Sequence, residues 1–382
     1  MSELKKIVFM TGTRADFGKL KSLINRLLDE TNIDVHIFVT GMHMLTKYGY
    51  TCDEVEKCGY KNIYKYINQN HNDTMDTVLA KTISGFSDYV KEVKPDMIVV
   101  HGDRVEAMAC AAVGSLNNIL IAHIEGGEVS GTIDELIRHA VSKLSHLHFV
   151  ANEQSKKRLI QLGEATNSIY VIGSPDIDIM ASKKLPTIEQ VKEHYNIDFD
   201  EYNILLYHPV TTEVDNLAGQ CRNLVDALIA SEKNFVVIYP NNDHGSDIIL
   251  NEYLRFDGNE KFKVFPSMRF EYFLTLMKCS NSMVGNSSAG VREAPFYGVP
   301  TINLGSRQKN RSLADTIINT EFDYQEIIQA LNDVGNLSAS YVHEFGDGRS
   351  DQQFCDILKK DDVWNKCNQK YFIDLNTTVP LT

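Results

Sequence analysis

The stretch "DMIVVHGDRVEAMACAAVGSLNNILIAHIEGG", residues 96–127, decides the fold class. It holds two apolar runs, 96–103 and 119–127, separated by a helical pattern that starts at about residue 104. Both runs are rich in β-branched residues and bounded by Gly, Asp or Asn, which is typical of buried parallel strands. A strand, a helix and a second strand in this order predict a right-handed βαβ unit.

The same alternation extends outward in both directions. Further helical patterns cover about 16–30, 74–93 and 133–145. The alternation pauses at about 175–200, a stretch rich in Lys, Glu and Asp, and then restarts. The other apolar runs, each of which predicts a strand, are 6–12, 34–41, 146–152, 168–174, 203–210, 234–243, 262–267, 282–288 and 300–306.

This order of elements predicts an α/β protein with two Rossmann-like, doubly wound domains that face a central cleft. The N-terminal domain is expected to span 1–175 and the C-terminal domain 200–350, with a linker at about 175–200 between them. The segment 350–382 is expected to be helical and to pack on either domain, with a return to the N-terminal domain as one option. Ligands of open α/β sheets bind beyond the carboxyl ends of the strands, and six strand ends from both halves carry polar residues here.

Composition excludes several classes of function. The 382 residues carry a formal net charge of -13, which argues against nucleic-acid binding because that needs a basic face. The seven cysteines form no CxxC pair and are expected to be free thiols in a reducing compartment. No stretch approaches the length of a membrane span, and the N-terminal apolar run is too short for a signal peptide. We expect a cytoplasmic protein without membrane or nucleic-acid partners.

Two carboxylates end neighbouring strands of the N-terminal domain. Asp103 ends the first apolar run of the opening stretch and Glu125 follows the second. Carboxylates this close do not ionise independently, so the pKa of one is expected to rise, which provides an acid and a base. The alternative for Asp103 is a structural one, an N-cap of the helix that starts at Arg104.

The segment "HIEGGEVSGTIDE", residues 123–135, combines capping residues with others that capping does not explain. Thr132 and Glu135 fit a capping box, and Asp134 lies in the first helical turn, where the dipole favours an acid. Three residues one turn apart are expected to pair on the surface of this helix: Glu135, Arg138 and His139.

The loop before that helix contains two adjacent glycines. Gly126 and Gly127 indicate unusual backbone angles or the close approach of a ligand. Glu125 and Glu128 flank them, and helix capping explains neither. Glu128 is left without a predicted role.

Two further strand ends could hold an anion. In "GTRADFG" (12–18), Asp16 is a candidate N-cap and Arg14 lies where a helix N-terminus attracts anions. In "GNSSAGVRE" (285–293), hydroxyls and backbone amides at a helix start could cradle a diphosphate, with a plain serine N-cap as the alternative. The residues proposed for this second cradle and its surroundings are Ser287, Ser288, Glu293 and Arg307.

The second domain also places a histidine at a strand end. His208 in "YHPV" is either structural or a ligand group positioned by Pro209. Asn241 occupies the matching place after the next strand. The sequence has no HExxH motif, and no metal site is predicted.

Together, "GTRADFGKL", "HGDR", "AHIEGGEVSGTIDELIRHAVSKLSHLHFVANE", "YHPVTTE" and "GNSSAGVREAPFYGVPTINLGSRQKNR" resemble the hydrolysing UDP-N-acetylglucosamine 2-epimerases, in order and from the first strand to about residue 311. The resemblance implies a two-domain GT-B fold that binds UDP between the domains and needs no cofactor. It implies conversion of UDP-N-acetylglucosamine and water to N-acetylmannosamine and UDP, the first step of sialic acid synthesis, by a homodimer or homotetramer.

By motif, the resemblance assigns catalysis to a set of acidic residues and a histidine: Asp103, Glu125, Asp134 and His208. It assigns the UDP-sugar site, besides His208, to Arg14, Gly18, Arg104, Asn241, Met268, Ser287, Ser288, Gly290, Glu293 and Arg307. The implied chemistry is removal of the C2 proton, departure of UDP to leave an acetamido-glycal, addition of water at C1 and reprotonation of C2 from the opposite face. Asp103 or Glu125 is expected to act on the C2 proton and Asp134 on the other face.

The hydrolysing branch is distinguished by two short segments. Non-hydrolysing epimerases have Pro-Glu after the first-loop arginine and an Ala-Gly-Leu-Arg-type sequence after the central glutamate. This chain has Ala15-Asp16 and Gly126-Gly127-Glu128 in those places. Three alternatives stay open: a sister 2-epimerase acting on UDP-2,4-diacetamido-2,4,6-trideoxyglucose, a GT-B glycosyltransferase, and an inactive nucleotide-sugar sensor.

Overall fold

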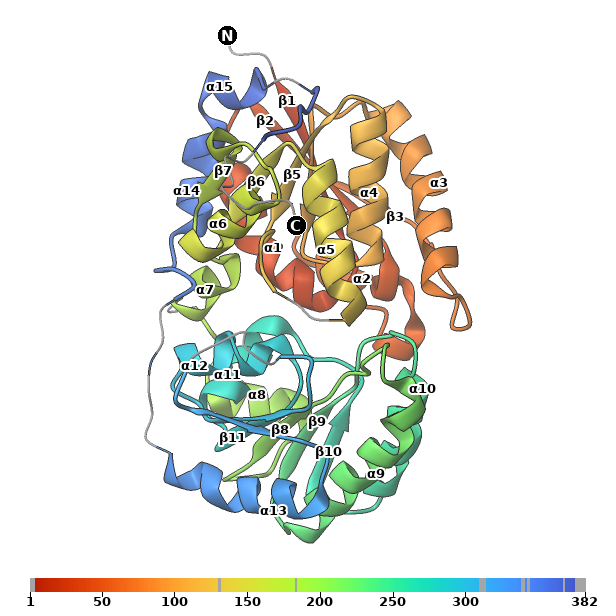
Figure 1. Cartoon of the computed structure of the whole chain (residues 1–382), viewed down its shortest axis with the longest axis vertical. Helices are drawn as coiled ribbons and strands as arrows, with labels where there is room; N and C mark the ends of the chain where they lie inside the picture. Colours follow the sequence, from red (N-terminus) through yellow and green to blue (C-terminus); the bar gives the residue numbers. More distant parts are fainter. Residues whose placement is uncertain are drawn as a thin grey trace, which may run out of the picture.

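The computed structural model describes residues 4–129, 132–182, 184–308, 314–337, 341, 344–366 and 368–374. Within them the chain forms two wholly parallel sheets, one of seven strands and one of six. Helices cover both faces of each sheet, and the two units lie one above the other in Figure 1. The predicted α/β class with two doubly wound sheets is confirmed.

The first sheet has the strand order β3-β2-β1-β4-β5-β6-β7. Its central strands are fully buried because helices cover both faces, which explains their continuous apolar runs. The edge strand β3 is half exposed and was not predicted. In sheet order the strands are β3 (Asn62–Lys65), β2 (Ile33–Val39), β1 (Lys5–Thr11), β4 (Met97–His101), β5 (Leu120–Ile124), β6 (Leu147–Val150) and β7 (Ile169–Val171).

The second sheet has the order β10-β9-β8-β11-β12-β13. Five of its strands fall within predicted runs, and the edge strand β13 was not predicted. In sheet order they are β10 (Phe262–Phe265), β9 (Phe235–Ile238), β8 (Asn203–Leu206), β11 (Ser282–Gly285), β12 (Thr301–Leu304) and β13 (Ile317–Thr320).

The helices between the strands follow the expected alternation. None of those formed by described residues is long and apolar enough to cross a membrane. They are α1 (Arg14–Leu27), α2 (Cys52–Glu56), α3 (Met75–Val93), α4 (Val105–Leu116), α5 (Thr132–Leu144), α6 (Glu153–Gln161), α7 (Pro175–Met180), α8 (Ile188–Tyr195), α9 (Val214–Ala230), α10 (Ser246–Tyr253), α11 (Phe270–Lys278), α12 (Glu293–Phe296), α13 (Tyr324–Asp333), α14 (Ser350–Leu358) and α15 (Asp361–Trp364).

Each sheet reverses its strand order at one point, and these two points position the site. In the first sheet β1 and β4 are neighbours that lead into α1 and α4 on either side of the reversal. In the second sheet β8 and β11 are the corresponding pair. Loops diverge from the carboxyl ends of such strands and leave a crevice. The two crevices face each other, which is the GT-B arrangement that was predicted.

The C-terminal part of the chain returns to the first sheet. Helix α14 packs against α1 and α7, and α15 follows it along the same unit (Figure 1). The Phe354 ring makes edge contacts with Phe149 and Phe9, with ring centroids 4.6 and 6.4 Å away. Asp178 of α7 accepts hydrogen bonds from the backbone N–H groups of Ser350 and Asp351, which ties down the start of α14.

Candidate active site

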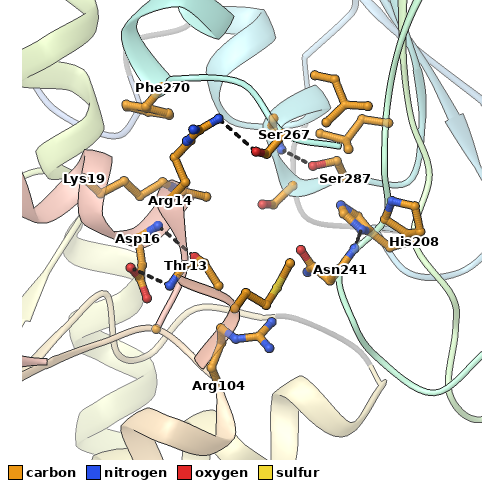
Figure 2. A pocket seen from close by; sticks show the side chains of 18 of the residues that line it. Thr13, Arg14, Asp16, Lys19, Arg104, His208, Asn241, Ser267, Phe270 and Ser287 are labelled. Carbon is orange, nitrogen blue, oxygen red and sulfur yellow. Dashed lines mark hydrogen bonds between the residues drawn. The ribbon is translucent and has the colours of Figure 1, made fainter. Parts of the chain in front are cut away.

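A cavity of about 280 Å³ lies between the carboxyl ends of the two sheets. Both units contribute to its wall, and Figure 2 shows side chains of the first loop opposite those of the second unit. Twelve of the predicted site residues line it: Arg14, Asp103, Arg104, Glu125, Asp134, His208, Asn241, Met268, Ser287, Ser288, Glu293 and Arg307.

Gly18 and Gly290, predicted to be part of the binding site, are not among the described residues that line the cavity. A Cβ atom at Gly18 would lie 2.5 Å from the Cβ atom of Phe270 on α11. A Cβ atom at Gly290 would lie 2.7 Å from Cγ2 of Thr301. Both glycines therefore allow close packing behind the site.

The first loop is organised by a capping box. Thr13, not Asp16, is the N-cap of α1; Asp16 occupies the third helical position and accepts from the backbone of Gly12 at 3.0 Å. Its interpretation as the N-cap was wrong because the helix starts earlier, at Arg14. The Arg14 side chain crosses to the second unit, where Nη1 donates to Ser267 Oγ at 2.9 Å (Figure 2).

Asp103 is held by an arginine and does not cap α4. The N-cap position is Arg104, which makes no side-chain capping bond, and Asp103 accepts from Arg138. Arg138 also donates to the backbone oxygen of Glu125 at 2.6 Å. Of the predicted surface trio, His139 and Glu135 pair at 3.1 Å, but Arg138 is buried in the site. The side chain of Thr132, proposed for the capping box, lies outside the described residues.

Asp134 is a carboxylate of the cavity wall whose pKa is raised. Burial and the negative charge of Asp103 raise the pKa of Asp134 to about 6, against the opposing effect of Arg307 at 2.8 Å. The sequence predicted a raised pKa for one member of the Asp103–Glu125 pair, but the pKa of Glu125 is lowered and a raised pKa belongs to Asp134. It paired Asp103 with the wrong partner, because α5 brings Asp134 back beside Asp103 while Glu125 is held by cations.

Glu125 is a buried and ionised carboxylate. Burial alone would raise its pKa, but Arg292, Lys19 and His101 outweigh burial and hold the pKa of Glu125 well below its usual range. Arg292 Nη2 lies 2.6 Å from Oε1, and His101 Nε2 lies 3.0 Å from Oε2. Glu125 has a φ of 62°, a left-handed conformation that costs a non-glycine residue of order 1–3 kcal/mol and is concentrated at functional sites.

The adjacent glycines serve the backbone and not a ligand. Gly127 has a φ of 74°, as expected, and a Cβ atom there would lie 2.3 Å from the backbone oxygen of Ser155. A Cβ atom at Gly126 would lie 2.8 Å from Nδ1 of His123. The loop therefore packs closely against α6 and β5. The two glycines are explained by this packing, so they need not indicate the close approach of a ligand.

His208 is a neutral hydrogen-bond donor toward the cavity. Its Nδ1 accepts from the backbone N–H of Asn241 at 3.0 Å, so the proton of the neutral ring is on Nε2. Burial, with Arg307 and Arg104 nearby, moves the pKa of His208 well below its usual value. Asn286 brackets the His208 backbone with hydrogen bonds of 2.7 and 2.8 Å, which fixes the ring's position.

The segment after β11 turns tightly. Ser287 caps the short 3₁₀ helix η5 (Ser288–Gly290) by accepting from the Ala289 backbone N–H at 3.3 Å, so the serine-cap alternative applies to this residue. Ser287 and Ser288 nevertheless line the cavity. Glu293 is buried 3.3 Å from Lys19, and burial raises its pKa.

Sequence reasoning assigned no site role to several charged or polar residues that complete the site. Lys19 has one detectable signal: it is a charged residue among the buried positions of α1, and lysine is almost never buried without a partner. Arg292 stands in the quoted segment 285–293 but had no local feature that marked it. The residues without an assigned site role are Lys19, His101, Arg138, Ser174, Asp176 and Arg292.

Residues 25–359 match the family model for UDP-N-acetylglucosamine 2-epimerase. A UDP-N-acetylglucosamine 2-epimerase of Neisseria meningitidis serogroup B is 47% identical over 377 residues, which cover 98% of this chain and 100% of that protein. The chain belongs to the UDP-N-acetylglucosamine 2-epimerase family.

A second relative and a solved structure are also similar to this chain. A UDP-N,N'-diacetylbacillosamine 2-epimerase (hydrolyzing) of Legionella pneumophila is 34% identical over 376 residues, which cover 96% of the chain and 99% of that protein. A solved structure of a UDP-GlcNAc 2-epimerase from Neisseria meningitidis, bound to UDP-GlcNAc, matches with a TM-score of 0.79 at 20% sequence identity. The match covers 92% of this chain and 99% of the chain in that structure. This structural likeness shows that the epimerase family member shares the two-unit fold.

Proposed function

We propose that this protein is a hydrolysing UDP-N-acetylglucosamine 2-epimerase, which converts UDP-N-acetylglucosamine and water to N-acetylmannosamine and UDP. The observation that carries the proposal is the contrast between two carboxyl groups in one cavity, an ionised Glu125 and an Asp134 whose pKa is about 6. Epimerisation through a glycal needs a base on one face of the sugar and an acid on the other. The product is one that sialic acid synthesis would consume.

The proposed reaction breaks and forms bonds in two stages. Glu125 or Asp103 takes the proton from C2, and the C1–O bond breaks so that UDP leaves with its electron pair. The resulting acetamido-glycal then gains hydroxide from water at C1 and a proton at C2 from the Asp134 side. Each well-placed acid or base contributes about 10²–10⁴ in rate.

The other predicted residues are proposed to hold the UDP-sugar. The neutral His208 offers its Nε2–H to a phosphate or sugar oxygen, and the hydroxyls of Ser287 and Ser288 add donors at the same wall. A cluster of arginines compensates for the diphosphate charge in a chain that is acidic overall: Arg14, Arg104 and Arg307.

The exact sugar is part of the proposal. The 47% identity to a relative named for UDP-N-acetylglucosamine, against 34% to one named for UDP-N,N'-diacetylbacillosamine, favours the first substrate. Location in the cytoplasm and assembly as a homodimer or homotetramer stay predictions. Light scattering on the purified protein measures the assembly directly.

Proton NMR in deuterated water tests the reaction. Incubation with UDP-N-acetylglucosamine should release UDP and N-acetylmannosamine that carries deuterium at C2. Product with protium at C2 would contradict the elimination route. Turnover of the diacetamido sugar alone would select the sister activity, and sugar transfer with C2 unchanged would indicate a glycosyltransferase.

A further inference from the structure

Arg292 reaches across the cavity from the second unit to a carboxylate of the first. It lies between η5 and α12, and its backbone N–H donates to the carbonyl of Ser288 at 3.0 Å. Its side chain is only 5% exposed. The short segment that carries the proposed diphosphate-binding serines therefore also carries this arginine, so the two are placed together.

The guanidinium group of Arg292 forms a bidentate salt bridge with Glu125 through both of its terminal nitrogens. Nη2 donates to Oε1 at 2.6 Å and Nη1 donates to Oε2 at 3.0 Å. Such a two-pronged bond fixes the plane of a carboxylate as well as its charge, which a lysine cannot do. The backbone of Glu125 is already in a left-handed conformation, so its side chain has few other orientations to adopt.

The arginine is itself held in a socket built by the first unit and the returning C-terminal segment. Nη1 also donates to Glu128 Oε2 at 3.0 Å, and Glu128 is buried. Nη2 donates to Ser174, whose hydroxyl donates in turn to Glu125. The guanidinium carbon lies 4.9 Å from the centre of the Phe345 ring. Charge, hydrogen bonds and stacking thus hold the guanidinium plane in one position.

We infer that Arg292 is a positioning residue for Glu125, and that Glu128 acts on Glu125 through Arg292. This inference rests on the proposed function, because it concerns how Glu125, one of the two proposed bases, is oriented. It gives Glu128 the role that sequence reasoning could not supply. It also links the two units: the proton-transfer group is fully aligned only when the segment carrying Ser287 and Ser288 is seated against the first unit.

The charges around Glu125 decide what removal of each partner does. The charged and titratable groups that face it or its immediate partners come from several elements. They are Lys19 of α1, His101 at the end of β4, Asp103 after β4, Glu128 in its own loop, Arg138 of α5, Asp176 of α7, Arg292 and Glu293. Arg292→Gln removes a cation, so it should raise the pKa of Glu125. Glu128→Gln removes an anion, so it should not.

The test combines kinetics with a pH profile. In Arg292→Gln, the acidic limb of kcat/KM should move upward by about 1–3 pH units, the usual effect of one opposite charge on a carboxyl group. Arg292→Lys should leave the limb near its wild-type position, because the positive charge is kept. Its kcat should fall about 10²-fold, because the contact that orients the Glu125 carboxylate is lost. Glu128→Gln should lower kcat about tenfold or more, with KM within about threefold and no upward movement of the limb.

Glu271→Gln is the matched control. It is the same substitution in another ion pair between the units, Glu271 with Lys21 at 2.6 Å, and the structure gives no contact of Glu271 with Glu125. This variant should have the kcat of the wild type, and the acidic limb of its kcat/KM profile should lie at the wild-type pH. UDP binding and thermal melting identify any variant that has not folded, and Arg292→Lys keeps the test valid if Arg292→Gln fails to fold.

Two outcomes separate the inference from the proposed function. A wild-type protein that does not epimerise any UDP-N-acetylated sugar refutes the proposed function. A wild-type protein that turns over, with folded Arg292 and Glu128 variants indistinguishable from Glu271→Gln, overturns the positioning role alone. A downward shift of the limb in Glu128→Gln with kcat unchanged would also overturn it, because Glu128 would then act on Glu125 through its charge alone and independently of Arg292.

Discussion

Arg307 and Asp134 meet across the cavity, with Nη2 of the arginine 2.8 Å from Oδ2 of the aspartate. One belongs to the loop after β12 in the second unit and the other to the first turn of α5 in the first unit. The pair does not bring the pKa of Asp134 back to an ordinary value, because burial and the charge of Asp103 act in the opposite direction and prevail.

This imbalance predicts a pH-dependent stability. The pKa of Asp134 is raised to about 6 in the folded protein, above the value in the unfolded chain. A carboxyl group whose pKa is raised by folding contributes its full stabilisation at low pH. This contribution to the free energy of unfolding is lost as the pH rises through about 6. Asp134→Asn imitates the protonated form. The melting temperature of this variant relative to wild type should therefore increase between pH 5 and about pH 7.5.

Differential scanning fluorimetry across this pH range measures the effect. The control is Asp88→Asn, which changes an aspartate whose side chain is 80% exposed on α3. A difference between Asp134→Asn and wild type that stays constant from low to high pH would contradict the raised pKa.

The fold was predictable from sequence wherever a strand is buried on both faces. Strands β1, β4 and β5 have fully buried central residues, and their continuous apolar runs identify them. The edge strands β3 and β13 escaped prediction because their sequences are mixed in polarity, whereas the edge strands β7 and β10 lie within predicted apolar runs. A continuous apolar run, and not strand formation as such, produced the detectable pattern.

The site was predictable to the extent that strand ends define it. Asp103 lies two residues after the end of β4 and Glu125 directly follows β5, so the sheet alone places them in the crevice. Their ion partners come from distant segments: Arg292 is 167 residues from Glu125 and 164 from Glu128. No local spacing encodes such a contact, and the partners decide which carboxyl group is ionised. The sequence therefore indicated the strand-end members of the site, but not the partners from distant segments or the protonation states that these partners set.

Asp103→Asn should abolish turnover and spare nucleotide binding. The amide oxygen can still accept from Arg138, so the geometry around α5 is kept, while the ability to take or give a proton is lost. We expect kcat to fall about 10²–10⁴-fold, the usual contribution of one acid or base. The dissociation constant of UDP, measured by calorimetry, should stay within about threefold of wild type. A variant that fails to bind UDP would show that Asp103 belongs to the binding site instead.

His208 should remain neutral, with its proton on Nε2, throughout the physiological pH range. Its Nδ1 is occupied by the Asn241 backbone N–H, and burial beside two arginines opposes a second proton. Nitrogen-15 NMR of the histidine rings, with His208→Gln to assign the signal, should show this tautomer unchanged from pH 5 to about pH 8.

Kinetics provides an independent check on His208. Gln keeps an N–H donor near the Nε2 position, and Phe does not. His208→Phe should therefore lose about 10²-fold or more in kcat/KM, comparable to the loss of one preorganised donor, and His208→Gln should lose less. Equal losses in both variants would indicate that the donor N–H is not what the reaction uses.

Gly18→Ala should destabilise the contact between the two units. The added Cβ atom would lie 2.5 Å from Cβ of Phe270 and 2.6 Å from its Cγ, so α1 and α11 must move apart. Overpacking of this kind costs about 1–3 kcal/mol in the free energy of unfolding, which urea denaturation measures. Gly219→Ala is the matched control, because Gly219 is an exposed residue of α9 with no atom within 4 Å of the new Cβ. That change should stabilise by about 0.5–1 kcal/mol through helix propensity. If Gly18→Ala behaved like Gly219→Ala, the packing contact between α1 and α11 would not be the reason for a glycine at position 18.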